Sequence, residues 1–132
     1  MTIAFVVPGS PLSQNRAYRR SIQRRMYKSD EAYAYTARLI IAAREARNGR
    51  AMLTGPVAVS LRVVFDSDRP DLDGPVKLVL DALQEPRARR PGAGLYANDR
   101  QVRRLVVERL VDRFDPRLEV VVEPLALGWP PP

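Results

Sequence analysis

The pattern of hydrophobic and polar positions predicts four strands. Apolar and polar residues alternate along residues 2–7 and 57–65, which is the period of a strand with one buried face. Two further runs, at 101–111 and 117–123, are joined around Asp115-Pro116. Residues 57–65 form the clearest strand, because their apolar side chains fall on one face without interruption.

A spacing of three to four residues predicts two helices. The longer one begins after Ser29 as its cap and ends near Asn48, with Gly49 as the stop. The shorter one takes Gly74 as N-cap and Pro75 as its first residue, and runs to about residue 84. The apolar stripe of the longer helix is Ala32, Tyr35, Leu39, Ala42, Ala43 and Ala46. The predicted buried face of the shorter helix is Val76, Val79, Leu80 and Leu83.

The order β-α-β-α-β-β predicts an α/β fold, with a single layer of mixed β-sheet packed with two main helices. At 132 residues the chain is expected to form one domain, residues 1–132, with a loosely ordered tail at 126–132. Residues 13–27 are expected to be a basic loop, and the proline- and glycine-rich stretch 85–94 a mobile one.

A cluster of charged residues surrounds the start of the shorter helix. Asp71 and Asp73 are expected on extended backbone between two prolines, where residues i and i+2 point to the same side. Lys77 and Asp81 follow on one helical face. They would also make an ordinary helical ion pair, but the more favourable order places the acid first. We therefore interpret the cluster as a functional site.

Composition excludes several chemistries and indicates a polyanionic partner. The chain contains no His and no Cys, which excludes histidine acid–base catalysis, thiolate chemistry and zinc-finger sites. Its net charge is +7. Every charged side chain in residues 1–29 is basic, whereas acids dominate residues 66–85. A basic protein with one concentrated acidic region is typical of a metal-dependent nuclease. No signal peptide or transmembrane run is found, so a cytoplasmic location without membrane association is expected.

The three carboxylates Asp71, Asp73 and Asp99 are candidate metal ligands. All-oxygen ligation favours hard cations, so Mg²⁺ is expected, with Mn²⁺ as a possible substitute. Lys77 is a candidate for stabilising developing negative charge on a phosphate. An EF-hand is excluded, because its spacing would place Arg69 and Leu80 at the first and last ligand positions. A sugar-nucleotide D-x-D site remains a weaker alternative.

Several motifs together resemble the RusA family of Holliday junction endodeoxyribonucleases. They are Arg69-Pro70-Asp71-Leu72-Asp73, Lys77, Asp81-Ala82-Leu83 and Asn98-Asp99-x-Gln101-Val102. The likeness extends to Pro8-x-x-Pro11-x-Ser13-x-Asn15-Arg16, Tyr33, Gly55-Pro56-Val57 and the final strands, and so covers most of the chain.

The resemblance implies a Mg²⁺-dependent homodimer that resolves four-way DNA junctions by paired incisions in recombination and repair. Asp71, Asp73 and Asp99 would be catalytic metal ligands, Lys77 the catalytic lysine and Asp81 a supporting residue that orients it. The expected DNA-binding residues are Ser13, Gln14, Asn15, Arg16, Arg19, Arg20 and Arg69. The dimer would use the apolar faces of the last two strands or of the long helix.

Three departures from the family pattern stand out. Gly74 replaces an Asn, which would loosen the turn, and Asn98 replaces the first Asp of a pair. The loop at 87–94 is longer than usual. None removes an expected ligand, so an active enzyme is predicted. The alternatives are a DNA-binding module that recruits or protects branched DNA with little or no catalysis, and a nuclease for flaps or loops.

Overall fold

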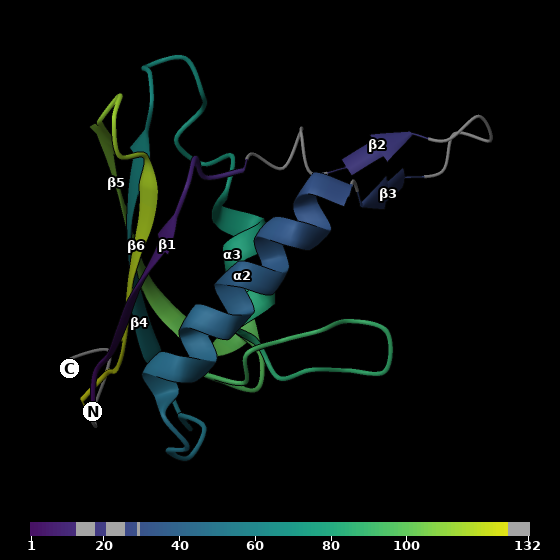
Figure 1. Cartoon of the computed structure of the whole chain (residues 1–132). Helices are drawn as coiled ribbons and strands as arrows, with labels where there is room; N and C mark the ends of the chain where they lie inside the picture. Colours follow the sequence, from purple (N-terminus) through teal and green to yellow (C-terminus); the bar gives the residue numbers. More distant parts are fainter. Residues whose placement is uncertain (13–17, 21–25, 29, 127–132) are drawn as a thin grey trace.

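The computed structural model describes residues 1–12, 18–20, 26–28 and 30–126. Its elements lie in two layers, a sheet and the helices beside it (Figure 1). In chain order they are β1 (Ile3–Pro8), β2 (Tyr18–Arg20), β3 (Met26–Lys28), α2 (Asp30–Arg47), β4 (Val57–Phe65), α3 (Val76–Leu83), the 3₁₀ helix η1 (Asp99–Gln101), β5 (Val102–Val111) and β6 (Arg117–Pro124). The predicted α/β fold with a mixed sheet and two main helices is confirmed.

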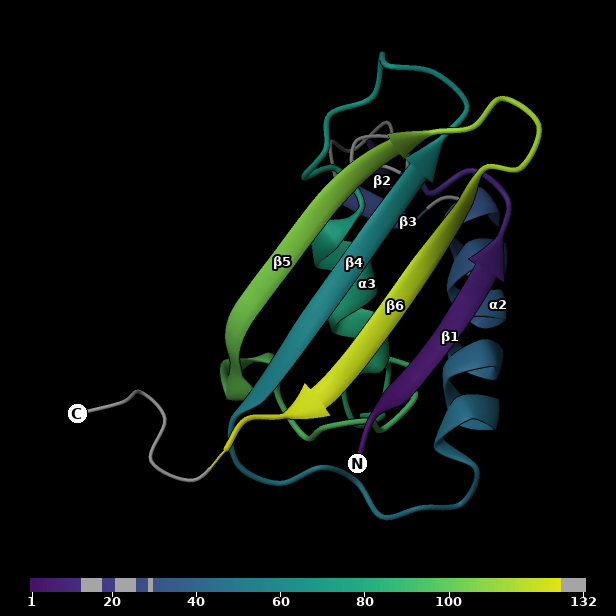
Figure 2. The ribbon, with the colours of Figure 1, turned by 90° about the vertical axis from the view of Figure 1, so that its left-hand side faces the viewer.

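The main sheet has the strand order β1-β6-β4-β5. The β4–β5 pair is parallel, and the other two pairs are antiparallel. β5 and β6 follow each other in the chain, yet β4 lies between them (Figure 2). β5 is therefore an edge strand, and the start of β5 lies beside the start of β4.

Both helices cover the same face of the sheet, and the opposite face is open (Figures 1 and 2). The regular alternation in β4 explains this arrangement, because Val57, Val59 and Val63 are fully buried on the helix side. α2 contributes Tyr35, Leu39 and Ala43 among others to this core, and α3 contributes Val79 and Leu83. No helix among the described residues is long and apolar enough to cross a membrane.

The buried face of α3 differs from the prediction. Leu78 and Ala82 are buried, whereas Val76 and Leu80 are only partly buried. The reason is a second neighbour that the helical period cannot reveal. Residues 93–95 run along the C-terminal end of the helix, where the Ala93 N–H donates to the Ala82 carbonyl at 2.8 Å. This segment covers the end of α3 from a second side, which accounts for the burial of Ala82, while Val76 and Leu80 are only partly covered by the core.

The expected extended backbone is wrong at Asp73, which lies inside a turn that begins at Asp71. Residues 72–75 form turns, in which the Gly74 N–H donates to the Asp71 carbonyl and the Val76 N–H to the Asp73 carbonyl, each at 3.1 Å. A proline restricts only the residue directly before it, here Arg69 and Gly74, so both aspartates are free to join a turn. The helix also begins one residue late, with Pro75 as its cap.

Two predicted loops contain more structure than expected. The basic loop includes the antiparallel hairpin β2–β3, which carries Arg19 and Arg20. The second half of the loop at 85–94 is anchored, since an Arg44 guanidinium N–H donates to the Gly92 carbonyl at 2.8 Å. A Cβ on Gly92 would lie 2.1 Å from the Gln84 carbonyl oxygen, so this close passage requires glycine. Of the tail predicted at 126–132, residues 127–132 lie outside the described residues.

Candidate active site

Two adjoining hollows lie beside α3. The first, of about 320 Å³, is lined by Asp73, Val76, Lys77, Leu80, Asp81 and Asp99. The second, of about 400 Å³, is lined by Asp71, Leu72, Asp73, Val76, Leu105, Val107 and Arg109. Asp73 and Val76 line both, so the two hollows are neighbours, and together they are called the acidic cleft below. The partly buried Val76 and Leu80 form part of its floor.

The turn before α3 presents two carboxylates to the acidic cleft. Asp71 and Asp73 are exposed, while Leu72 between them is partly buried and packs against the core. The leucine therefore fixes the turn against the protein and leaves an acid on either side of it. This local arrangement brings the two carboxylates to the cleft even though the backbone is not extended.

Asp99 reaches the cleft from the short helix η1, whose N-terminal backbone N–H groups are capped by two side chains. The Asn98 side chain accepts the Arg100 N–H at 2.9 Å. The Gln101 side-chain oxygen accepts the N–H groups of Ala97 at 2.8 Å and Asn98 at 3.2 Å. Its amide then donates to the carbonyls of Leu53 and Gly55. This capping box holds the backbone of Asp99 against the segment before β4.

Lys77 and Asp81 form the helical ion pair, with 3.6 Å between Nζ and Oδ2. The other carboxylate oxygen of Asp81 accepts the Gln84 side-chain amide at 3.2 Å. Asp81 is thus held by two partners, whereas the Lys77 side chain is 61% exposed. Asp81 is consequently suited to orienting the lysine, which was its predicted supporting role.

Tyr96 lies fully buried beneath the same region. Its hydroxyl donates to the Leu80 carbonyl at 2.9 Å. Burial raises the pKa of Tyr96 well above its ordinary value, and the nearby Asp99 and Asp81 carboxylates raise it further. The phenol therefore stays protonated and serves to anchor α3 rather than to exchange protons.

The fold brings together the five acidic and basic residues expected at the site, because Asp71, Asp73, Lys77, Asp81 and Asp99 all line the acidic cleft. Within the described residues, however, no three carboxylates group closely enough to hold a metal ion unaided. Arg69 is exposed and immediately precedes this site. Of the other expected DNA-binding residues, Ser13, Gln14, Asn15 and Arg16 lie outside the described residues, and only the backbone of Arg19 and Arg20 is described.

Arg109 is a residue of the cleft that the sequence interpretation missed. It occupies a helix-side position of β5, in register with the buried Val63. The other cleft-lining residues on that face of β5, Leu105 and Val107, are apolar. An arginine at an apolar position of an alternating strand was the available signal.

The comparison with known proteins supports the same interpretation. The family model described as Endodeoxyribonuclease RusA matches residues 8–123. The chain belongs to the RusA endodeoxyribonuclease family. No curated protein sequence matches it. Membership of the RusA family makes the protein a nuclease of DNA and implies Holliday junction resolvase activity.

One departure from the RusA pattern now has a structural account. Asn98 caps η1 through its side-chain oxygen, and this is a task that an aspartate performs equally well. The replacement therefore keeps the backbone of the neighbouring Asp99 in place. The loop at 85–94 of this RusA-family chain is fixed at its second half against α2, through Arg44 and Arg47.

The donors of the acidic cleft fit a hard divalent cation by their chemistry. Asp73 faces both hollows, with Asp99 in one and Asp71 in the other. All three supply carboxylate oxygens, which Mg²⁺ prefers. Because Mg²⁺ keeps waters and shares its coordination with substrate phosphate, it does not require a complete cage of protein ligands.

Proposed function

We propose that this RusA-family protein is a Mg²⁺-dependent endodeoxyribonuclease that resolves four-way DNA junctions by paired incisions. The observation that carries the proposal is the acidic cleft. Three carboxylates line it together with Lys77: Asp71 and Asp73 from the turn before α3, and Asp99 from η1, more than twenty-five residues later in the chain. An open cleft suits a phosphodiester backbone better than it suits a small enclosed ligand.

The cleft residues divide between holding the cation and handling charge on DNA. Asp71, Asp73 and Asp99 would hold Mg²⁺, which when bound supplies water activation and charge stabilisation at the phosphate. Lys77 is largely exposed, so its ammonium group could reach a phosphate oxygen while Asp81 orients its side chain. Mn²⁺ would serve as a substitute, since it accepts the same oxygen donors.

Binding of the junction is assigned to basic residues around the cleft. Arg69 is exposed two residues before Asp71, so a strand whose phosphate reaches the carboxylates would pass near it. Residues 13–16, with Arg19 and Arg20 of β2, would extend the contact along the backbone. This division explains how a protein of net charge +7 can bind DNA at a site that is itself acidic.

The partner is proposed to be a second copy of the chain, because two incisions need two sites held in fixed relation. The open face of the sheet is the better supported interface. Its exposed apolar side chains include Val6, Val106 and Leu110. The charged residues on this face of the main sheet are balanced, whereas the chain as a whole is basic. They are Arg62, Arg104 and Arg117, and Glu108, Glu119 and Glu123.

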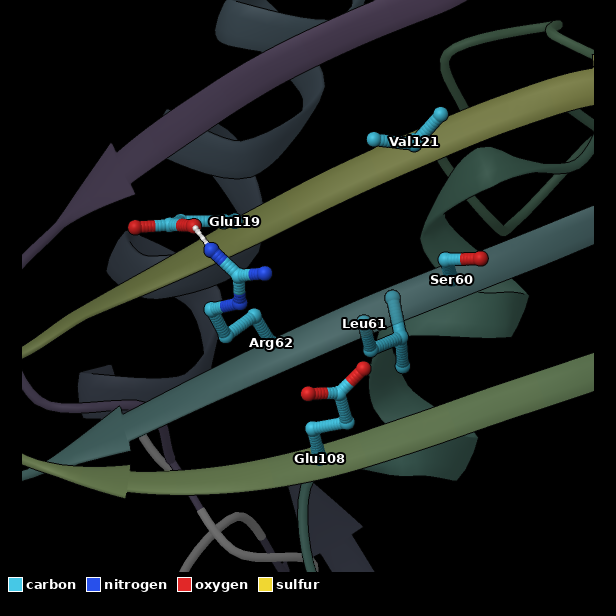
Figure 3. A pocket seen from close by; sticks show the side chains of 6 residues that line it. All are labelled: Ser60, Leu61, Arg62, Glu108, Glu119 and Val121. Carbon is cyan, nitrogen blue, oxygen red and sulfur yellow. Dashed lines mark hydrogen bonds and ion pairs between the residues drawn. The ribbon is translucent and has the colours of Figure 1, made fainter.

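A balanced, partly apolar face is poorly suited to DNA and well suited to a copy of itself. Arg62 donates to Glu119 at 3.2 Å across two strands, next to Glu108 in a hollow of about 150 Å³ (Figure 3). In a two-fold interface, the arginines of one copy can form ion pairs with the glutamates of the other copy. The alternative interface, the outer side of α2, exposes Tyr33 and Ile41 as its large apolar residues.

Incubating the protein with a labelled four-way junction and Mg²⁺ tests this function. Symmetric nicks in two opposing strands are expected. Binding without nicking would instead support a DNA-binding module whose acids form a structural network, as the Lys77–Asp81 pair allows. Competition with flap and loop substrates would show whether the junction is the preferred one.

A further inference from the structure

Arg109 connects β5 to the loop that leads to Asp71, one of the proposed metal ligands. Its guanidinium lies 5.5 Å from the ring centroid of Phe65, the last residue of β4. Its Nη1 donates to the Asp68 carbonyl at 2.9 Å. Phe65 is buried, so the guanidinium plane has a rigid surface to rest on. One side chain thereby joins the end of β4, the edge strand β5 and the loop at 66–71.

This loop has few other attachments to the fold. The Arg69 N–H makes a long local contact of 3.4 Å with the Ser67 hydroxyl. Among the described residues, the bond from Arg109 is the one hydrogen bond that a side chain distant in sequence gives to residues 66–70. The chain leading to Asp71 is therefore held by Arg109 on one side, as Leu72 holds the turn on the other.

Arg109 also brings a charge to the acidic cleft. It lines the same hollow as Asp71 and Asp73. Within the described part of the chain it has no carboxylate at ion-pair distance, unlike Lys77, which pairs with Asp81. A cation beside two neighbouring carboxylates reduces the repulsion between them and favours a turn that keeps both in the cleft.

We propose that Arg109 is a positioning residue of the nuclease site, fixing the 66–71 loop so that Asp71 stands at a productive distance from Asp73. The inference rests on the proposed function. A lysine would not replace the arginine, because it lacks both the plane that stacks on Phe65 and the fork that reaches the Asp68 carbonyl.

The test compares Arg109→Gln and Arg109→Lys with the matched control Arg50→Gln. Arg50 also donates to backbone carbonyls, those of Ala46 and Arg47, but at the end of α2. Three quantities are measured for each variant. They are the single-turnover cleavage rate at a saturating concentration of junction, the melting temperature, and the affinity of the DNA-free protein for Mn²⁺ by calorimetry. Both Arg109 variants should lose about 10- to 100-fold in cleavage rate and bind Mn²⁺ more weakly, as is typical when a support of a metal ligand is removed. The affinity of both Arg109 variants for the junction should equal that of the wild type. The Arg50→Gln variant should match the wild type in cleavage rate and in Mn²⁺ affinity.

Three outcomes would overturn the positioning role. Wild-type cleavage and Mn²⁺ affinity in Arg109→Lys would mean that a positive charge alone suffices. Arg109→Gln could instead cleave at the wild-type rate at saturating junction, while the slope of log affinity against log salt falls by about 0.9. That result would make Arg109 a phosphate contact. A rate loss with unaltered Mn²⁺ affinity would also contradict it. If the wild-type protein itself fails to cut a junction, the proposed function fails instead.

Discussion

Gln101 accepts the backbone N–H of Asn98 through its side-chain oxygen, at 3.2 Å, and so closes the short helix that begins with Asp99. The same side chain bonds to the carbonyls of Leu53 and Gly55, which lie almost fifty residues earlier. A single glutamine thus links a proposed metal ligand to the start of the central strand.

We predict that Gln101→Leu both destabilises the protein and slows cleavage. The change removes the partners of two N–H groups and two carbonyls, and an unsatisfied buried group costs roughly 1–3 kcal/mol. Thermal denaturation should show a lower melting temperature, and junction cleavage measured well below it should still be reduced, because Asp99 is no longer held. Equal melting temperature and equal cleavage would show that the capping box does not support the site.

The family departure at position 98 is predicted to be nearly neutral. Asn98→Asp keeps the acceptor for the Arg100 N–H, so stability and cleavage should stay close to wild type. Asn98→Ala removes the cap and should cost about 1 kcal/mol in the free energy of unfolding. Denaturant titration of both variants checks this. A large gain of activity in Asn98→Asp would instead assign that carboxylate a direct role.

The carboxylates themselves are predicted to be required for chemistry and not for folding. Asp71→Asn, Asp73→Asn and Asp99→Asn should each abolish cleavage, because Asn keeps the shape but loses the charge that would hold Mg²⁺. Junction binding should persist or strengthen, since a charge that repels phosphate is removed. Asp81→Asn should be milder, because Asp81 acts through Lys77.

The melting temperature of these variants in metal-free buffer provides the control. It should equal or exceed that of the wild type, because clustered acids repel one another when no cation is present. Unfolded variants beside a stable metal-free parent would show that the acids form a structural network, and the nuclease assignment of these residues would be wrong.

Neutralising Arg16, Arg19 and Arg20 together is predicted to weaken junction binding and its salt dependence. Each lost phosphate contact should lower the slope of log affinity against log salt by about 0.9. Fluorescence anisotropy over a salt series measures both quantities. Unchanged binding would move the DNA surface to another part of the protein.

A charge placed on the open sheet face should dissociate the proposed dimer. Val106→Glu replaces an exposed apolar side chain, beside Glu108 on the same face, by an acid that a second copy would cover, and its burial without a partner is costly. Ile41→Glu on the outer side of α2 is the matched control, since Ile41 is similarly exposed. Light scattering should report a monomer for the first variant and a dimer for the second. The reverse result would place the interface on α2.

Local pattern was sufficient to predict most of the elements. The strand Val57–Phe65 has the predicted bounds, and α2 ends at Arg47, one residue before its predicted end. In both cases a periodic apolar face coincides with a clear terminating residue. The acids of the site were also identifiable, because Asp71, Asp73 and Asp99 stand out in a chain without His or Cys.

Other features depend on contacts between distant segments and were decided by the tertiary structure. The insertion of β4 between β5 and β6 placed Arg109 in register with Val63, and so beside the acids. Residues 93–95 bond along the C-terminal end of α3 and help to bury Ala82, whereas Leu80 is only partly buried and lines the cleft. Period and turn signals record only what each segment prefers on its own. Which side chains meet across the cleft follows from the order and register in which the strands pair.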